Sequence, residues 1–152
     1  MTVKTELLHS NQLFASLGPE ELERISKLIF VRSYKSGRTL FFEDTPGEVM
    51  YLIQTGTVGI FKTGSDKKEL QLATLGGGSF FGEMSLLDDR PRSATARVVE
   101  DAELVVITKK AFEQMLETDP GITSKILIAL LKAVFQRLRT TDDKFKNLIS
   151  TG

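Results

Sequence analysis

The segment Gly76–Ala96 reads GGGSFFGEMSLLDDRPRSATA, and it combines glycine corners, a short apolar run and residues of both charges, among them Glu83 and Arg92. Gly82 permits a positive φ or a close backbone approach, and Met84–Leu87 can form one short helical turn. The free amides at the start of such a turn can bind an anion. Arg92 follows a proline and precedes the apolar stretch Ser93–Val99. We therefore expect a buried guanidinium, which needs an anionic partner.

Arg92 has two candidate partners. Glu83 belongs to the same segment, and a Glu83–Arg92 salt bridge that only holds the loop together would account for both charges. Alternatively, the guanidinium faces an empty cavity that receives an anion from solution. The pattern of charges alone leaves both interpretations open.

On both sides of this segment, between Arg38 and Ile107, short apolar runs alternate with glycine, proline, aspartate and serine. This pattern is typical of short strands joined by tight turns. The predicted strands are 39–42, 49–53, 57–62, 70–75, 93–99 and 102–107. Many short strands with glycine corners predict a compact antiparallel barrel or roll.

Helical periodicity flanks the predicted strands. Apolar residues recur every three or four positions from Leu13 to Phe30, with Pro19 as a first-turn signal. The helical pattern returns at Lys109, and Asp119 can cap a long helix that starts at Pro120. A heptad seam on this helix consists of Leu127, Leu131, Val134, Leu138, Thr141, Phe145 and Leu148. The seam predicts parallel pairing with a second copy, and packing of this face on the roll is the simpler alternative.

Composition excludes several classes of function. The chain has 152 residues, with 20 basic and 20 acidic ones, so binding of nucleic acid over a broad face is not expected. Cysteine is absent, which removes disulfides and thiolate metal sites. No apolar run approaches the roughly 20 residues of a membrane span. We therefore expect a soluble cytoplasmic protein with no membrane contact.

Catalysis has no candidate residues. The sequence contains no histidine-rich, carboxylate-rich or serine-triad arrangement, so we expect neither an enzyme nor a metal or cofactor. His9 is the single histidine and lies in a polar segment, and we interpret it as a solvated residue rather than a ligand.

The charged segment also resembles a known motif. Phe81–Leu87 followed by Pro91–Thr95 resembles the phosphate-binding cassette of the cyclic-nucleotide-binding domain family, which includes kinase regulatory subunits, gated ion channels and catabolite-activator-type regulators. The resemblance continues upstream through Gly37–Phe41 and Met50–Val58 and covers essentially the whole chain. One departure is Glu43-Asp44, where many members carry a glycine, and it leaves the shape of that turn open.

The resemblance implies a mainly β fold with flanking helices. The core would be an antiparallel double-stranded β-helix, a jelly-roll-like β-roll, with an N-terminal helix and a long C-terminal helix. We expect a single domain over 1–152, with an N-terminal helical segment at 1–36 and C-terminal helices at 109–152. The β-roll at 37–108 would contain the cassette at 81–95.

The resemblance also implies roles for cassette residues. Arg92 would pair with an exocyclic phosphate oxygen, and Glu83 would accept a hydrogen bond from the ribose 2′-hydroxyl. The Ser93 amide and hydroxyl would complete the phosphate cradle with the amides near Met84, beside Phe81 and Gly82. Ser85 would add a contact or cap the turn.

The base would be covered from outside the cassette. Leu72 and Ala73 would line the ribose and base side, although strand parity is open. The stretch Arg137–Lys144 resembles the part of the catabolite-activator dimer helix that faces adenine. Thr141 would then hydrogen-bond the base edge, and Asp142 would reach across from the partner subunit. Alternatively, Thr141 is a small residue tolerated in the seam.

Three hypotheses for function follow. The leading one is a homodimeric sensory module that binds a cyclic nucleotide and couples binding to movement of its C-terminal helix. Ser93 and Thr141 favour cAMP over cGMP. The second is a ligand-free dimerisation scaffold whose pocket is closed by Glu83 and Arg92. The third is the sensory part of a transcription regulator that lacks its DNA-binding domain, because no helix-turn-helix follows the long helix before Gly152.

Overall fold

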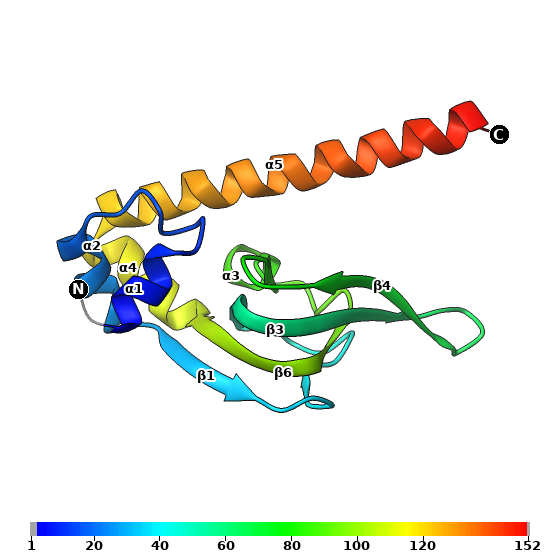
Figure 1. Ribbon diagram of the computed structural model, residues 1–152, viewed down its shortest axis with the longest axis horizontal. Helices are drawn as coiled ribbons and strands as arrows, with labels where there is room; N and C mark the ends of the chain where they lie inside the picture. Colours follow the sequence, from blue (N-terminus) through cyan, green and yellow to red (C-terminus); the bar gives the residue numbers. More distant parts are fainter. Residues whose placement is uncertain (1–2, 152) are drawn as a thin grey trace.

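The computed structural model describes residues 3–151 (Figure 1). Residues 1 and 2, at the start of the predicted segment 1–36, and residue 152, at the end of the predicted segment 109–152, lie outside the described residues. The helices are α1 (Val3–His9), α2 (Pro19–Ser26), α3 (Met84–Leu87), α4 (Lys109–Thr118) and α5 (Pro120–Thr151). The strands are β1 (Phe30–Tyr34), β2 (Thr39–Phe41), β3 (Val49–Thr63), β4 (Glu69–Leu75), β5 (Phe80–Phe81) and β6 (Thr95–Thr108).

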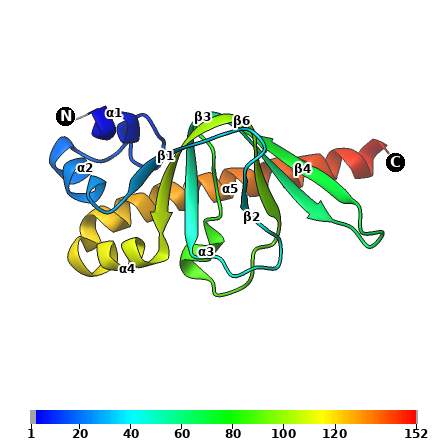
Figure 2. The ribbon, with the colours of Figure 1, turned by 90° about the horizontal axis from the view of Figure 1, so that it is seen from below.

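The strands form one antiparallel sheet. Its main path is β1-β6-β3-β4, with β2 paired to β6 and β5 paired to β3. The sheet curves into a roll, and α5 runs along its length (Figures 1 and 2). This architecture confirms the predicted antiparallel roll with flanking helices and a long C-terminal helix.

Two long bent strands replace four of the predicted short ones. The predicted pair 49–53 and 57–62 is the single strand β3, and the pair 93–99 and 102–107 is the single strand β6. Register shifts between Ile53 and Val58 let β3 bend without ending. Gly56 lies at this bend with φ 91°, where a Cβ would lie 2.3 Å from the carbonyl oxygen of Asp101. The glycine therefore marks a bend within a strand, not the end of one.

The N-terminal segment is less helical than predicted. A continuous helix from Leu13 to Phe30 is wrong, because α2 covers only Pro19–Ser26 and the next segment is strand β1. The Gly18 amide donates to Glu21 Oε1 over 3.0 Å and starts α2. β1 pairs with residues 102–106 of β6, a contact that local periodicity cannot reveal. The first helix, α1, lies inside the helical segment expected at 1–36, ahead of the periodic stretch that starts at Leu13.

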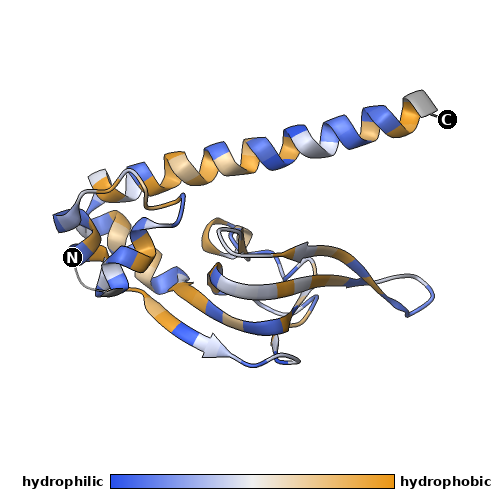
Figure 3. Cartoon of the chain, viewed as in Figure 1, coloured by the Kyte–Doolittle hydropathy of each residue, from blue (hydrophilic) through white to orange (hydrophobic). Residues whose placement is uncertain are grey.

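Two hydrophobic clusters hold the fold together. One joins α1, α2, α4 and the first half of α5 to one end of the sheet, around the fully buried Phe14 and Leu52. Figure 3 shows hydrophobic segments gathered where these helices meet. The other fills the roll around Ile53 and Val58. The helices thus anchor the base of α5, and the roll keeps its own core.

The long helix uses two different faces. Ile122, Ile126 and Leu130 are buried against the first cluster. The predicted seam is covered only in part: Leu127 and Val134 are partly buried and pack against this cluster, whereas the exposed fractions of the other apolar seam residues are 53% for Leu131, 55% for Leu138, 63% for Phe145 and 71% for Leu148. Packing of the seam on its own domain therefore accounts for some of its residues and leaves these four exposed.

Within residues 3–151, none of the helices is both long and apolar enough to serve as a transmembrane span.

The bend at Gly56 provides a test of the sheet geometry. Gly56→Ala should lower the free energy of unfolding by about 2 kcal/mol or more, because the residue has a positive φ and the new Cβ would meet the backbone of β6. Urea denaturation measures this change. Gly76→Ala is the control, since a Cβ there meets nothing within 4 Å. Equal stability of the two variants would contradict the assignment of Gly56 to a tight bend of β3.

Candidate ligand-binding site

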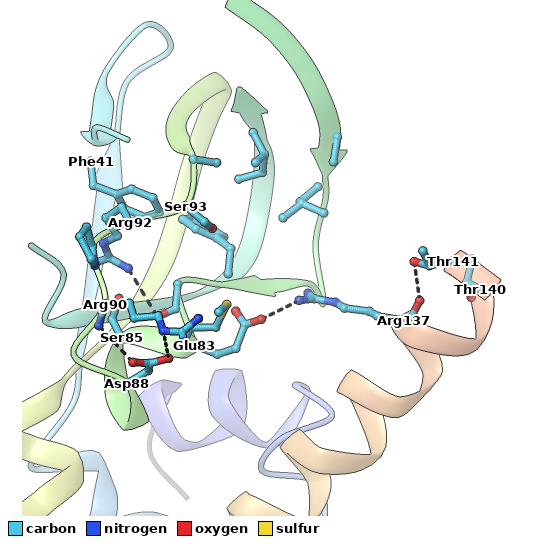
Figure 4. Close-up of a pocket in the computed structure, with 18 of the residues that line it drawn as sticks. Phe41, Glu83, Ser85, Asp88, Arg90, Arg92, Ser93, Arg137, Thr140 and Thr141 are labelled. Carbon is cyan, nitrogen blue, oxygen red and sulfur yellow. Dashed lines mark hydrogen bonds and ion pairs between the residues drawn. The ribbon is translucent and has the colours of Figure 1, made fainter. Parts of the chain in front are cut away.

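A cavity of about 520 Å³ lies between the roll and α5 (Figure 4). Its walls come from strands β2 to β5, from the segment that contains α3 and the loop after it, and from one face of α5. The lining residues are Phe41, Ile60, Ala73, Leu75, Phe81, Gly82, Glu83, Met84, Ser85, Asp88, Arg90, Pro91, Arg92, Ser93, Ala94, Gln136, Arg137, Thr140, Thr141 and Lys144.

The Arg92 guanidinium lines this cavity and is buried, with 6% of the residue exposed. Its Nη2 donates to the Val49 carbonyl over 2.7 Å and its Nη1 to the Gly82 carbonyl over 3.4 Å. The guanidinium carbon lies 3.9 Å from the centroid of the Phe41 ring. No carboxylate within residues 3–151 forms a salt bridge with it, and its Nε has no acceptor there. The charge is thus solvated by carbonyl and ring dipoles without a counter-ion.

The electrostatics of Arg92 follow from this burial. Desolvation lowers the pKa of the guanidinium, and the charges of Tyr51 and Glu83 oppose that shift. Burial likewise raises the pKa of the Tyr51 hydroxyl. An arginine stays protonated despite such a shift, so a positive charge is held at the wall of the cavity. A buried cation without a paired anion is costly, and an anion entering the cavity would relieve that cost.

Backbone contacts hold Arg92 in place. Its amide donates to the Thr45 carbonyl and its carbonyl accepts from the Asp44 amide, both over 2.8 Å. Asp44 adopts φ 64°, a left-handed conformation that aspartate tolerates better than most residues. The turn at Glu43-Asp44, whose shape the sequence left open, is therefore formed and supports the loop that carries Arg92.

Two glycines make room for the arginine. A Cβ at Gly47 would lie 2.4 Å from Arg92 Nε and 2.5 Å from Ser85 Oγ. A Cβ at Gly82, where φ is 78°, would lie 2.8 Å from Arg92 Nη1. Any side chain at either position would push the guanidinium away from its carbonyl acceptors.

The ion pair of Glu83 differs from the one considered from sequence. The Glu83–Arg92 salt bridge is absent, and Glu83 Oε1 instead pairs with Arg137 Nη1 of α5 at 3.2 Å (Figure 4). The interpretation of Glu83 and Arg92 as a loop clamp that closes the pocket is therefore wrong, because the cavity lies open beside both. The sequence analysis did not predict the pairing of Arg137 with Glu83, since only the tertiary fold brings α5 against the cassette.

The helical turn α3 shapes the cassette as expected. The Ser85 amide donates to the Gly82 carbonyl over 3.2 Å and the Leu86 amide to the Glu83 carbonyl over 3.1 Å. The Met84 amide is at the first helical position, where no intrahelical acceptor exists. Phe81 and Ser93 also line the cavity, and Phe81 stacks on Tyr51 with the ring centroids 5.1 Å apart.

The alternation of side chains along β4 decides which of its two predicted residues, Leu72 or Ala73, faces the cavity. Ala73 lines the cavity and pairs with Ile60, which lines it too. Leu72 does not line it, and its side chain is 59% exposed, so its predicted placement beside the ligand is wrong. Alternate residues of a strand face opposite sides, which is why one of two neighbours had to be excluded.

The α5 wall includes one of the two predicted helix residues. Thr141 lines the cavity, whereas Asp142 is exposed and lies outside it. Gln136 also lines the cavity, as do Arg137, Thr140 and Lys144 from the stretch that was predicted to face the base without individual roles. Steps of three and four residues connect these positions, for example Gln136 to Thr140 and Thr141 to Lys144, so they form one helix face.

The cavity carries an excess of positive charge. Four basic side chains line it, those of Arg90, Arg92, Arg137 and Lys144, against the two acidic ones of Glu83 and Asp88. Asp88 faces Arg90 with Oδ2 and Nε 3.6 Å apart. Among residues 3–151, no group of three or more histidine, cysteine or carboxylate side chains could hold a metal ion. The site therefore suits a small organic anion.

A family model described as the cyclic nucleotide-binding domain matches residues 31–119. The chain belongs to the cyclic nucleotide-binding domain family. It is 36% identical over 135 residues to the cyclic AMP receptor protein of Thermus thermophilus, a match that spans 89% of this chain and 61% of that protein. It is 31% identical over 110 residues to a cAMP-dependent protein kinase regulatory subunit of Hypocrea atroviridis, spanning 72% of this chain and 23% of that one.

Solved structures agree with this membership. A cyclic nucleotide-binding domain from Methylobacillus flagellatus superposes with a TM-score of 0.82 at 29% identity, covering 93% of this chain and 79% of that one. The relatives named here are regulators, and the chain spans less than two thirds of the length of the Thermus protein. The cyclic-nucleotide-binding domain fold is thus shown for this chain.

The space at Gly47 provides a test of the cassette geometry. Gly47→Ala should lower the free energy of unfolding by about 1–3 kcal/mol, because its Cβ overlaps Arg92 and Ser85 in a closely packed site. Urea denaturation measures the effect. The control is Gly121→Ala at the start of α5, where a Cβ meets nothing within 4 Å. Unchanged stability of Gly47→Ala would show that Arg92 is not held as described.

Proposed function

We propose that this cyclic nucleotide-binding domain is a regulatory module that binds cAMP in the cavity between the cassette and α5. The observation that carries the proposal is the buried Arg92 guanidinium, which lines a cavity of about 520 Å³ and has no carboxylate partner within residues 3–151. A cyclic phosphodiester carries one negative charge and would supply the missing counter-ion. Charge-assisted hydrogen bonds of this kind contribute about 1.5–3 kcal/mol each.

The proposed contacts extend from Arg92 along the cassette. The Ser93 hydroxyl and the Met84 amide would bind further phosphate oxygens. Glu83 would accept a hydrogen bond from the ribose 2′-hydroxyl, and Ala73 and Phe81 would pack against the sugar and base. All five residues line the cavity, which supports these roles.

The α5 wall offers acceptors for a purine base. The hydroxyls of Thr140 and Thr141 donate to the carbonyls of Gln136 and Arg137, each over 3.0 Å. With their protons engaged, the two oxygens offer lone pairs, which suit the exocyclic amino group of adenine or of guanine. The names of the Thermus and Hypocrea relatives also refer to cAMP. We therefore propose cAMP over cGMP.

A regulatory role follows from where the ligand would sit. The cavity is lined by the cassette and by α5 together, so a bound nucleotide contacts both. Such a ligand shifts the position of α5 if it binds one helix arrangement better than another. We propose this coupling as the output, in a protein without catalytic activity. The absence of cysteine is compatible with the reducing cytoplasm, where we place it.

Homodimerisation through α5 is the second part of the proposal. Leu131, Leu138 and Phe145 repeat every seven residues and are each more than half exposed. Apolar residues with heptad spacing bury this surface by pairing with a second helix. A parallel pair would also bring Asp142 of the partner subunit near the cavity.

Titration of the 152-residue protein with cAMP tests the binding proposal. Calorimetry should give saturable binding, and Arg92→Leu should weaken it by about 100-fold or more, because the phosphate loses its charged partner. The ligand-free stability of Arg92→Leu should change by less than about 1 kcal/mol, since the variant removes a buried charge without a counter-ion. Arg38→Leu, at an exposed position outside the cavity, is the control. Absence of binding to the wild type at millimolar cAMP would refute the proposal.

Sedimentation velocity tests the dimer. Leu138→Lys should convert a dimer into a monomer at micromolar protein concentration, because two buried lysines would face each other across the seam. Ser124→Lys adds the same charge to an exposed site of α5 outside the seam and should leave the dimer intact. A wild-type protein that sediments as a monomer would contradict the dimer without affecting the binding proposal.

A further inference from the structure

The aromatic ring of Phe41 covers one face of the Arg92 guanidinium. The guanidinium carbon lies 3.9 Å from the ring centroid, which is within the range of a cation–π contact. Figure 4 shows the two side chains next to each other at the wall of the cavity. The carbonyls of Val49 and Gly82 accept hydrogen bonds from N–H groups, which lie in the plane of the guanidinium. The carbonyls therefore hold its edge, and the ring holds its face.

Phe41 belongs to a cluster of four aromatic rings. Its ring stacks on that of Tyr51, with the centroids 6.2 Å apart and an angle of 27° between the planes, and lies 6.0 Å from that of Phe81. Tyr51 also meets Tyr34 edge-on, at 6.4 Å. Tyr51 and Phe81 are buried in the core of the roll. The ring beneath the guanidinium is thus fixed from behind by the core.

Glu83 offers Arg92 a competing position. Both residues belong to the cassette and line the same cavity. Desolvation lowers the pKa of the Arg92 guanidinium, and the charges of Tyr51 and Glu83 oppose that shift. A salt bridge between Glu83 and Arg92 would neutralise both charges and engage the N–H groups that a phosphodiester needs. A cation–π contact and a partly exposed salt bridge are of comparable strength, so the ring can decide between the two positions.

The ring differs from a carboxylate in what it leaves free. A π contact stabilises the positive charge through the electron-rich face of the ring and does not neutralise it. It also uses none of the in-plane N–H groups of Arg92. The N–H groups that do not reach Val49 or Gly82 can therefore still donate to an anion in the cavity.

Building on the proposed function, we propose that Phe41 is a positioning residue for phosphodiester binding. Its π face holds the Arg92 guanidinium at the cavity wall and away from Glu83. Arg92 thereby stays available to the phosphate, and Glu83 to the ribose. The affinity for the ligand consequently depends on the electron density of a ring that need not touch it.

Calorimetric titration of the 152-residue protein with cAMP tests this inference. Phe41→Leu keeps an apolar side chain on β2 but removes the π face. The affinity should fall roughly tenfold, because the guanidinium then occupies the binding position only part of the time. Phe61→Leu is the matched control. Phe61 lies outside the cavity with the guanidinium carbon of Arg97 4.8 Å from its centroid, and its loss should leave the affinity unchanged.

Fluorination separates the charge distribution of the ring from its bulk. Phe41→trifluorophenylalanine nearly preserves the shape of the ring but withdraws electron density from its face. It should weaken cAMP binding roughly three- to tenfold, and Phe41→monofluorophenylalanine should give an intermediate loss. A residue that acts only by packing would not produce this graded series. The same substitutions at Phe61 should leave the affinity unchanged.

A double mutant tests the competition with Glu83. In a Glu83→Gln background, Phe41→Leu should change the affinity for cAMP by less than about twofold, because the competing carboxylate is gone. An undiminished effect of Phe41→Leu in that background would show that the ring does not act against Glu83. Thermal unfolding of each variant establishes that it is folded.

The outcomes separate this inference from the proposed function. A wild type that does not bind cAMP overturns both. If the wild type binds and Phe41→Leu binds equally well or more tightly, the proposed function stands and the inference is overturned. The inference also fails if Phe41→Leu weakens binding but fluorination does not, since the ring would then act through its bulk.

Discussion

A buried guanidinium without a counter-ion is the constraint on which the rest of this site depends. Arg92 is held by carbonyls of Val49 and Gly82 and by the ring of Phe41, and none of these carries a charge. Carbonyl and ring dipoles solvate a cation less well than water does. The folded protein keeps this unfavourable arrangement at the wall of a cavity, where an anion can complete it.

The surrounding fold lets the backbone at two glycines lie close to the Arg92 side chain. Gly47 and Gly82 leave space that a single methyl group would fill, and the turn at Asp44 fixes the backbone of Arg92. The cassette adds the short turn α3, whose first amide faces no acceptor within its own helix. Two glycines and one left-handed aspartate therefore help to shape the pocket beside its charged residues.

The long helix connects this pocket to the surface of the protein. One face of α5 is anchored by Ile122, Ile126 and Leu130, and the turns that follow carry Arg137 and Thr141 to the cavity. Another face leaves Leu138 exposed. One helix thus carries the anchor, part of the cavity wall and the exposed seam. This geometry suits a regulator, in agreement with the named relatives.

The sequence by itself determined the fold family, through the resemblance of its cassette and upstream strands to known members, and its local patterns of glycine, proline and apolar residues predicted the antiparallel roll, the short turn at Met84–Leu87 and the burial of Arg92. It could not determine that Gly56 bends a continuous strand, that β1 pairs with β6, or that Leu72 faces away from the cavity. Nor could it pair Glu83 with Arg137, 54 positions along the chain. These outcomes depend on contacts between segments distant in sequence, and only the packed tertiary structure brings such segments together.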